Sequence, residues 1–80
     1  MFLKKIGIDT PSLGFGLQVS NRLIYCEAFA NDESYFILFN SRRVAEIKLG
    51  EDCNWFLWGG KPTSQSLINE IGQRIENHFM

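Results

Sequence analysis

The sequence predicts an α+β fold, in which an antiparallel β-meander of four to six strands packs on one C-terminal amphipathic α-helix. Short segments rich in β-branched and aromatic residues follow one another with turn-forming residues between them. The short connections imply antiparallel pairing. Apolar residues recur at helical spacing near the C-terminus. A length of 80 residues predicts a single domain, 1–80.

Four segments before the helix are the main strand candidates, and two earlier segments are weaker ones. The main candidates are separated by Asn31-Asp32, by Asn40-Ser41 and by the turn at 50–52. Pro11 separates the two weaker ones, because proline has no N–H for a central ladder position. The main candidates are 22–29, 34–39, 43–49 and 53–58, and the weaker ones are 2–8 and 15–19.

The C-terminal segment is predicted to be an amphipathic helix. Thr63 or Ser64 can act as the N-cap, because either hydroxyl oxygen can accept a hydrogen bond from a first-turn backbone N–H. Gly72 lies beside the apolar stripe, and glycine costs about 1 kcal/mol relative to alanine in a helix. Its expected role is to let the helix approach the sheet closely. The apolar stripe consists of Leu67, Ile68, Ile71, Ile75 and Phe79.

Loop parity predicts which strand residues share the face that the helix covers, because side chains alternate along a strand and paired residues point to the same side. An even-length loop at Asn40-Ser41 places Phe36 and Leu38 on the face of Ala45. An odd-length loop at 50–52 then adds the last predicted strand to it. The expected core face is Phe36, Leu38, Ala45, Ile47, Leu49, Cys53, Trp55 and Leu57.

The opposite face of the sheet is predicted to be rich in aromatic residues. Each large aromatic side chain can bury roughly 150–250 Å², so a cluster of them exceeds the apolar patch that monomers usually expose. Two coverings are open. Residues 1–20 fold back over this face, using Phe2, Ile6 and Ile8 or Phe15, Leu17 and Val19, or they extend the sheet and the face is an interface, most simply of a twofold homodimer. The predicted face is Tyr35, Ile37, Phe39, Val44, Phe56 and Trp58, and the predicted interface residues are Tyr35, Ile37, Phe39, Phe56 and Trp58.

The sequence favours a non-catalytic protein over an enzyme. Cys26 and Cys53 lie in apolar segments and are expected to be reduced and buried, and His78 falls in the last helical turn. The spacing of these three residues is not that of a zinc site. The carboxylates fall mostly in predicted turns, away from an apolar pocket. We therefore expect no catalytic residue, no cofactor and no metal ligand.

Charge and hydropathy narrow the expected partners and location. The formal net charge is −1, and the basic residues occur as isolated pairs, so no electrostatic footprint for nucleic acid is visible. The first residues do not have the pattern of a signal peptide, and no apolar run is long enough to span a bilayer. The expectation is a cytoplasmic protein without membrane contact, whose partner is a second copy or another protein.

The segment 35–79 resembles a recurrent pattern in small uncharacterised bacterial proteins: an apolar strand, an Asn-centred turn, an AxI strand, a lone Trp and a helix that reads IGxxIExH. The resemblance implies only the hairpin, hairpin and helix arrangement, and no activity. Ser41 departs from the pattern, since glycine is more usual after Asn40.

Two functional hypotheses follow from the sequence. The first is an interaction module, homodimeric through the aromatic face. The alternative is a small-ligand-binding domain or modest enzyme, with a pocket between the sheet and the N-terminal segment and with Cys26 or Glu27 near its mouth.

Overall fold

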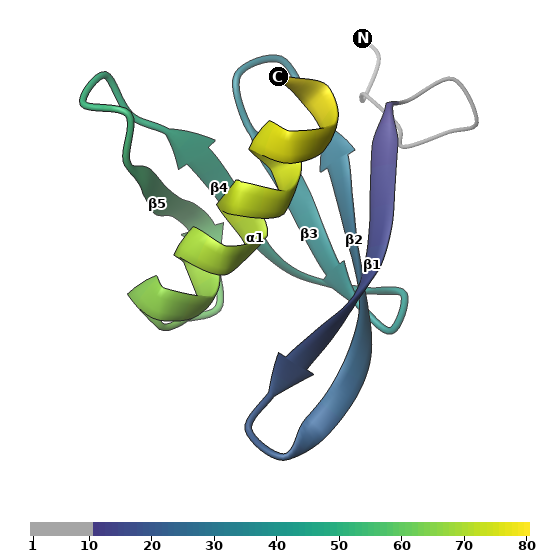
Figure 1. Cartoon of the computed structure of the whole chain (residues 1–80). Coiled ribbons are helices and arrows are strands. Elements are labelled where there is room, and N and C mark those ends of the chain that lie inside the picture. Colours follow the sequence, from purple (N-terminus) through teal and green to yellow (C-terminus); the bar gives the residue numbers. More distant parts are fainter. Residues whose placement is uncertain (1–10) are drawn as a thin grey trace, which may run out of the picture.

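The computed structural model describes residues 11–80 and shows five strands in one antiparallel sheet, with one helix packed on it (Figure 1). The strands pair in chain order, so the sheet is a meander. This arrangement confirms the predicted fold class, while the predicted strand at 2–8 lies outside the described residues. The elements are β1 (Ser12–Val19), β2 (Arg22–Ala30), β3 (Tyr35–Phe39), β4 (Arg42–Leu49), β5 (Trp55–Gly60) and α1 (Gln65–Phe79).

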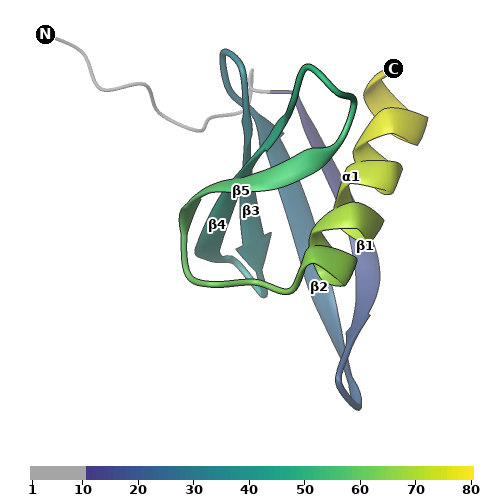
Figure 2. The same cartoon turned by 90° about the vertical axis from the view of Figure 1, so that its left-hand side faces the viewer.

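The helix lies on one side of the sheet and leaves the other side uncovered by any described element (Figure 2). Ser64 is its N-cap, and the Ser64 hydroxyl accepts a hydrogen bond from the Leu67 N–H. This resolves the choice between Thr63 and Ser64. The predicted apolar stripe faces the sheet: Ile68, Ile71 and Ile75 are buried, and Leu67 and Phe79 pack against the core.

Gly72 brings the helix into direct contact with β5, as predicted. A Cβ atom at Gly72 would lie 2.3 Å from Cδ1 of Trp55, so no side chain fits there. Helix α1 also holds the Trp55 residue by hydrogen bonds. The indole Nε1 donates to Glu76 at 2.6 Å, and the Gln65 amide donates to the Trp55 carbonyl at 2.7 Å. The Trp55 ring is therefore fixed between the helix and the sheet.

Strands β3 and β4 are joined by a two-residue turn. Phe39 pairs with Arg42, and the intervening Asn40 and Ser41 have φ angles of 50° and 70°. Positive φ at both central positions is typical of a type I′ turn, which matches the twist of a hairpin. The predicted even loop length is therefore correct.

A β-bulge nevertheless reverses the predicted faces of β3. The register shifts between Ile37 and Leu38, so that Ile37 pairs with Ala45 and Phe36 pairs with Glu46. One extra residue on β4 shifts the pairing beyond the bulge by one position, so Ile37 instead of Phe36 shares the face of Ala45. The placement of Phe36 and Leu38 under the helix was wrong: Tyr35, Ile37 and Phe39 lie on the helix side.

The buried core lies between α1 and the sheet. Small side chains from β2 and β4 lie there, together with the larger aliphatic side chains of the helix. Val44, which we had expected on the opposite face, also packs against the core. The buried hydrophobic residues are Leu17, Cys26, Ala28, Ile37, Ala45, Ile47, Trp55, Ile68, Ile71 and Ile75.

Strand β1 extends the sheet instead of folding across it. It pairs with β2 from Ser12 to Val19 without a register shift, and its Leu17 is buried in the helix-side core. The predicted covering of the second face by Phe15, Leu17 and Val19 is therefore wrong, because these side chains belong to the helix side. The other suggested cover, from residues 2–8, lies outside the described part of the chain.

Candidate functional site

The candidate site is the sheet surface that faces away from α1, which we call the open face. Its members follow from the observed pairing, because residues opposite one another in the ladder share a face. Phe36 pairs with Phe29 on one side and with Glu46 on the other, and Lys48 pairs with Phe56. The larger side chains that strands β2 to β5 place on the open face are Leu23, Tyr25, Glu27, Phe29, Phe36, Leu38, Arg43, Glu46, Lys48, Phe56 and Trp58.

Large apolar side chains of the open face are accessible to solvent in the described residues. Trp58 is 58% exposed, Tyr25 51%, Leu23 75% and Phe56 36%. Trp58 stands at a second β-bulge, where the register between β4 and β5 shifts at Glu46 and Ile47. A bulge re-aims a side chain relative to a regular strand. The Trp58 ring meets the Phe56 ring edge-on, with centroids 6.0 Å apart.

Two cationic side chains lie over aromatic rings of the open face. The Arg43 guanidinium carbon is 3.8 Å from the centroid of the Phe36 ring, and the Lys48 ammonium is 4.5 Å from the Trp58 ring. Such contacts contribute about 0.5–1 kcal/mol at exposed sites. The long side chains lie along the rings and keep their charges near water.

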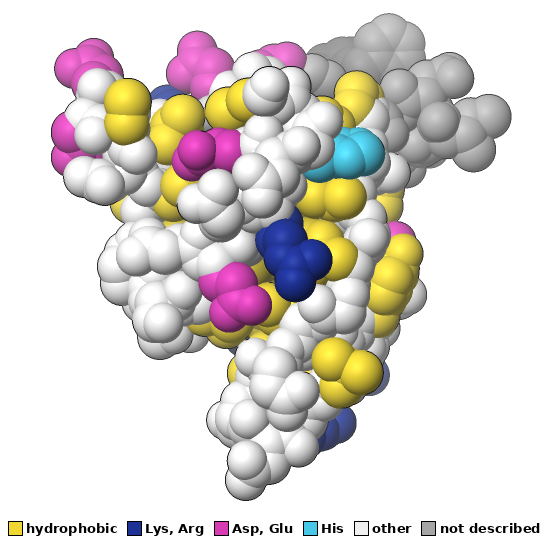
Figure 3. Space-filling view, viewed as in Figure 1, with side chains coloured by type: hydrophobic (Ala, Val, Ile, Leu, Met, Phe, Trp, Pro, Cys, Tyr) yellow, Lys and Arg dark blue, Asp and Glu magenta, His cyan; other side chains and the backbone are white. Residues whose placement is uncertain are grey.

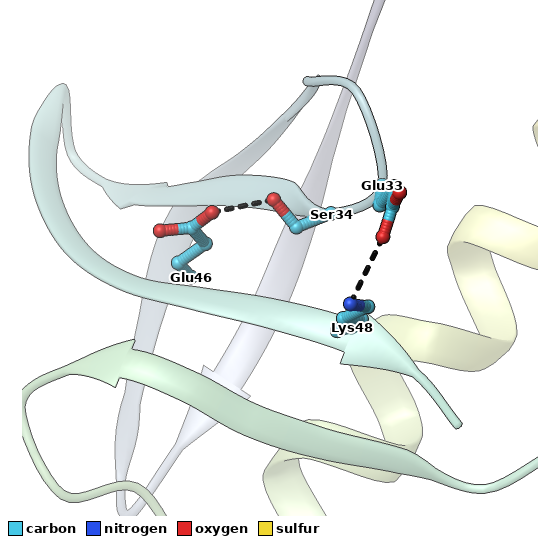
Figure 4. A network of polar contacts seen from close by, with 4 residues as sticks. All are labelled: Glu33, Ser34, Glu46 and Lys48. Carbon is cyan, nitrogen blue, oxygen red and sulfur yellow. Dashed lines mark hydrogen bonds and ion pairs between the residues drawn. The ribbon is translucent and has the colours of Figure 1, made fainter. Parts of the chain in front are cut away.

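Carboxylates balance these cations. Lys48 forms an ion pair with Glu33 at 3.1 Å, and the Ser34 hydroxyl donates to Glu46 at 2.5 Å (Figure 4). Arg43 lies 4.0 Å from Glu46. Ser34 is buried, so its hydroxyl fixes the Glu46 carboxylate at the sheet surface. The open face is thus apolar with a balanced set of charges.

The structure places two of the five predicted interface residues on the open face. Phe56 and Trp58 are there, whereas Ile37 is completely buried beneath the helix. Tyr35 and Phe39 lie on the helix side too, where the Tyr35 ring meets the Trp55 ring edge-on and contacts the Phe79 ring at a tilt. These three were assigned to the wrong face because the β3–β4 bulge was not foreseen.

Tyr25 and Phe29 also belong to the open face, although neither was predicted there. Their signal was the loop at 31–34, whose even length pairs Ala28 with Ile37 and Phe29 with Phe36. The small side chains of β2 then lie under the helix, and its aromatic rings face the other way. Loop parity at this hairpin places both residues on the face of Phe36, so they join the open face only once the β3–β4 bulge has fixed the side of Phe36.

The residues considered for catalysis are not brought together. Cys26 is completely buried in the core, and burial raises the pKa of its thiol to about 12, so it is a poor nucleophile. Cys53, which we had expected to be buried in a strand, is exposed in the turn between β4 and β5 with a φ of 67°. His78 is exposed in the last turn of the helix.

Other kinds of site find little support among residues 11–80. No group of three or more His, Cys, Asp or Glu side chains there could hold a metal ion. No helix in this part of the chain is long and apolar enough to cross a membrane. The pocket of the alternative hypothesis would involve residues outside the described part. Cys26 cannot line its mouth, because it is inaccessible, and Glu27 lies on the open face.

No protein-family model matches this chain, and neither a curated protein nor a solved structure is significantly similar to it. Function is therefore inferred from the open face itself.

Proposed function

We propose that this chain is a non-catalytic protein-interaction module that forms a homodimer through the open face. The observation that carries the proposal is the exposure of Tyr25, Phe56 and Trp58 on one sheet surface. With roughly 150–250 Å² for each large aromatic side chain, these three alone leave on the order of 300 Å² accessible. Leu23 and the half-buried Phe29, Phe36 and Leu38 enlarge this patch beyond what monomers commonly expose.

The dimensions of the open face support a second copy as its occupant. Five strands about 4.8 Å apart, each roughly 17–30 Å long, give a flat area of about 500 Å². Side chains that stand on this surface increase the accessible area. A standard interface takes about 800 Å² from each partner. The open face is therefore large enough to supply most of a stable interface.

The charges of the open face also support self-association. Arg43 and Lys48 are balanced by Glu27 and Glu46, so two identical faces do not repel each other through net charge. A twofold axis brings the same patch of both copies together. Lys48 and Arg43 lie along aromatic rings, so the methylene groups of their side chains add apolar surface to the contact between the two copies.

Size-exclusion chromatography with light scattering tests the proposal. The wild-type chain is expected to be a dimer at tens of micromolar, and the pair of substitutions Trp58→Ala and Phe56→Ser is expected to give a monomer with a native far-UV circular dichroism spectrum. Met80→Ala is the matched control, because Met80 is an exposed apolar side chain (68%) at the end of the helix. A wild-type chain that is strictly monomeric at this concentration would contradict the proposal.

A further inference from the structure

Strand β1 forms one edge of the described sheet, next to a groove along helix α1. The free backbone groups of β1 can be assigned from the ladder. The Ala30 N–H donates to the Pro11 carbonyl, so alternate residues from Leu13 to Val19 direct their backbone groups toward β2. The N–H and C=O groups of Ser12, Gly14, Gly16 and Gln18 consequently point away from the sheet.

This edge lacks the usual protection against strand addition. Natural edge strands carry charged residues, proline or bulges that discourage pairing with another chain. Over its eight residues β1 has none of these, and its register with β2 is unbroken. The other described edge, β5, has a bulge beside Trp58 and a glycine at φ 96°, Gly60. The regular edge suited to a further strand is therefore β1.

The groove beside β1 contains two hollows along the seam with the helix. One, of about 280 Å³, is lined by Leu13, Phe15, Arg74, Asn77 and His78. The other, of about 260 Å³, lies at the far end of β1, where Val19 and Glu70 are among its lining residues. Figure 3 shows this side of the molecule, with hydrophobic side chains visible beside a basic one.

Charge differs between the two ends of this groove. Arg74 lies over the Phe15 ring at 5.0 Å, and neither of the two ion pairs within the described chain includes it. Glu70 lies at the opposite end. A strand that runs antiparallel to β1 would have its N-terminal end near Glu70 and its C-terminal end near Arg74. A peptide strand of complementary charge therefore has a basic residue at its N-terminal end and an acidic residue at its C-terminal end.

We propose that the β1 edge binds an extended peptide as a sixth antiparallel strand, with apolar side chains at alternate positions, a basic residue at its N-terminal end and an acidic residue at its C-terminal end. Backbone hydrogen bonds to Gly14 and Gly16 supply affinity in this mode of recognition, and the groove supplies specificity. The peptide side chains that face the groove lie opposite Phe15 and Leu17, where they extend the helix-side core. This site is distinct from the open face.

The test uses a fluorescent peptide with the sequence Lys-Thr-Val-Thr-Val-Thr-Glu, which spans the positions opposite 19 to 13 in that order. Fluorescence polarisation is expected to show saturable binding to the full chain. The reversed-charge peptide Glu-Thr-Val-Thr-Val-Thr-Lys should bind at least about tenfold more weakly, which corresponds to about 1.4 kcal/mol. Arg74→Glu should reduce or invert this preference.

Two substitutions at one position provide the structural control. Gly16→Pro removes an outward N–H without removing a bond to β2, and it should abolish binding. Gly16→Ala keeps the N–H, and its added Cβ meets only Leu23 at an ordinary contact distance of 3.5 Å, so binding should persist. Circular dichroism checks that both variants are folded.

Three results would overturn the proposal. The first is the absence of saturable binding below about 1 mM peptide, and the second is equal binding by Gly16→Pro. The third is slow hydrogen exchange of the Gly16 amide in the free chain, because it would show that another segment or a second copy already occupies the edge. The first two results do not bear on the open face, so the peptide proposal can fail while the open-face proposal stands.

Discussion

Replacing Gly72 with alanine is expected to destabilise the fold, although alanine is the better helix former. In an exposed helix the change would stabilise by about 1 kcal/mol. Here the new Cβ would lie 2.3 to 2.5 Å from three atoms of the Trp55 indole. Atoms cannot remain at that distance, so either the helix or the ring has to move.

The ring has little freedom to move. Its Nε1 is hydrogen-bonded to Glu76, and the Gln65 amide holds its backbone carbonyl. Forcing an extra methyl group into a packed core typically costs about 1–3 kcal/mol. After subtraction of the gain in helix propensity, Gly72→Ala is expected to lower the free energy of unfolding by up to about 2 kcal/mol.

Urea denaturation followed by circular dichroism measures this difference. Gln73→Ala is the control, because Gln73 is an exposed helix residue, where alanine should be neutral or slightly stabilising. In a Trp55→Leu background, Gly72→Ala should no longer destabilise, because the indole is absent. A stabilising effect of Gly72→Ala in the wild-type background would refute the close contact between helix and β5.

Four further predictions concern single residues. Ser64→Ala should destabilise by about 1 kcal/mol in urea denaturation, because the Leu67 N–H loses its cap; an unchanged midpoint would contradict this. Ser41→Gly should raise the melting temperature, since Ser41 has a φ of 70° that glycine adopts without strain, and a lower melting temperature would argue against the type I′ turn. Because the folded-state pKa of Cys26 is raised from 9.0 to about 12, its contribution to stability is complete below pH 9 and is lost between pH 9 and 12, where the unfolded thiol ionises first. Stability should therefore fall more steeply with pH over this interval in the wild type than in Cys26→Ala. In thiol labelling of the folded chain at pH 8, only Cys53 should react, and rapid labelling of Cys26 would contradict its burial.

The elements of this fold were predictable because each has a local signal. The helix stripe, the strand composition and the alternative caps could all be identified from neighbouring residues, and the structure agrees with them from Ser64 to Phe79. Gly72 predicted a close approach of the helix to the sheet, because a glycine beside an apolar stripe indicates that a larger side chain would not fit. The group that leaves no room for a side chain is the Trp55 indole.

The faces of β3 were not predictable from the Asn40-Ser41 loop alone. A bulge adds one residue without changing the turn. The predicted loop length was therefore right, but the predicted faces of the β3 residues were still reversed. The open face therefore gained Phe36 and lost Ile37. Cys53 is exposed because the connection from β4 to β5 is longer than the predicted turn. Cys53 lies in this connection and has a positive φ, so it is not part of a strand.

Contacts between copies at Trp58 are the most direct test of the proposed interaction module. A sample that mixes isotopically labelled and unlabelled chains allows isotope-filtered nuclear Overhauser spectra to detect only contacts between different copies. We expect such contacts from the Trp58 indole to side chains of the open face, including Phe36 and Tyr25. Spectra at millimolar concentration in which every contact of the Trp58 indole is within its own chain would contradict the account.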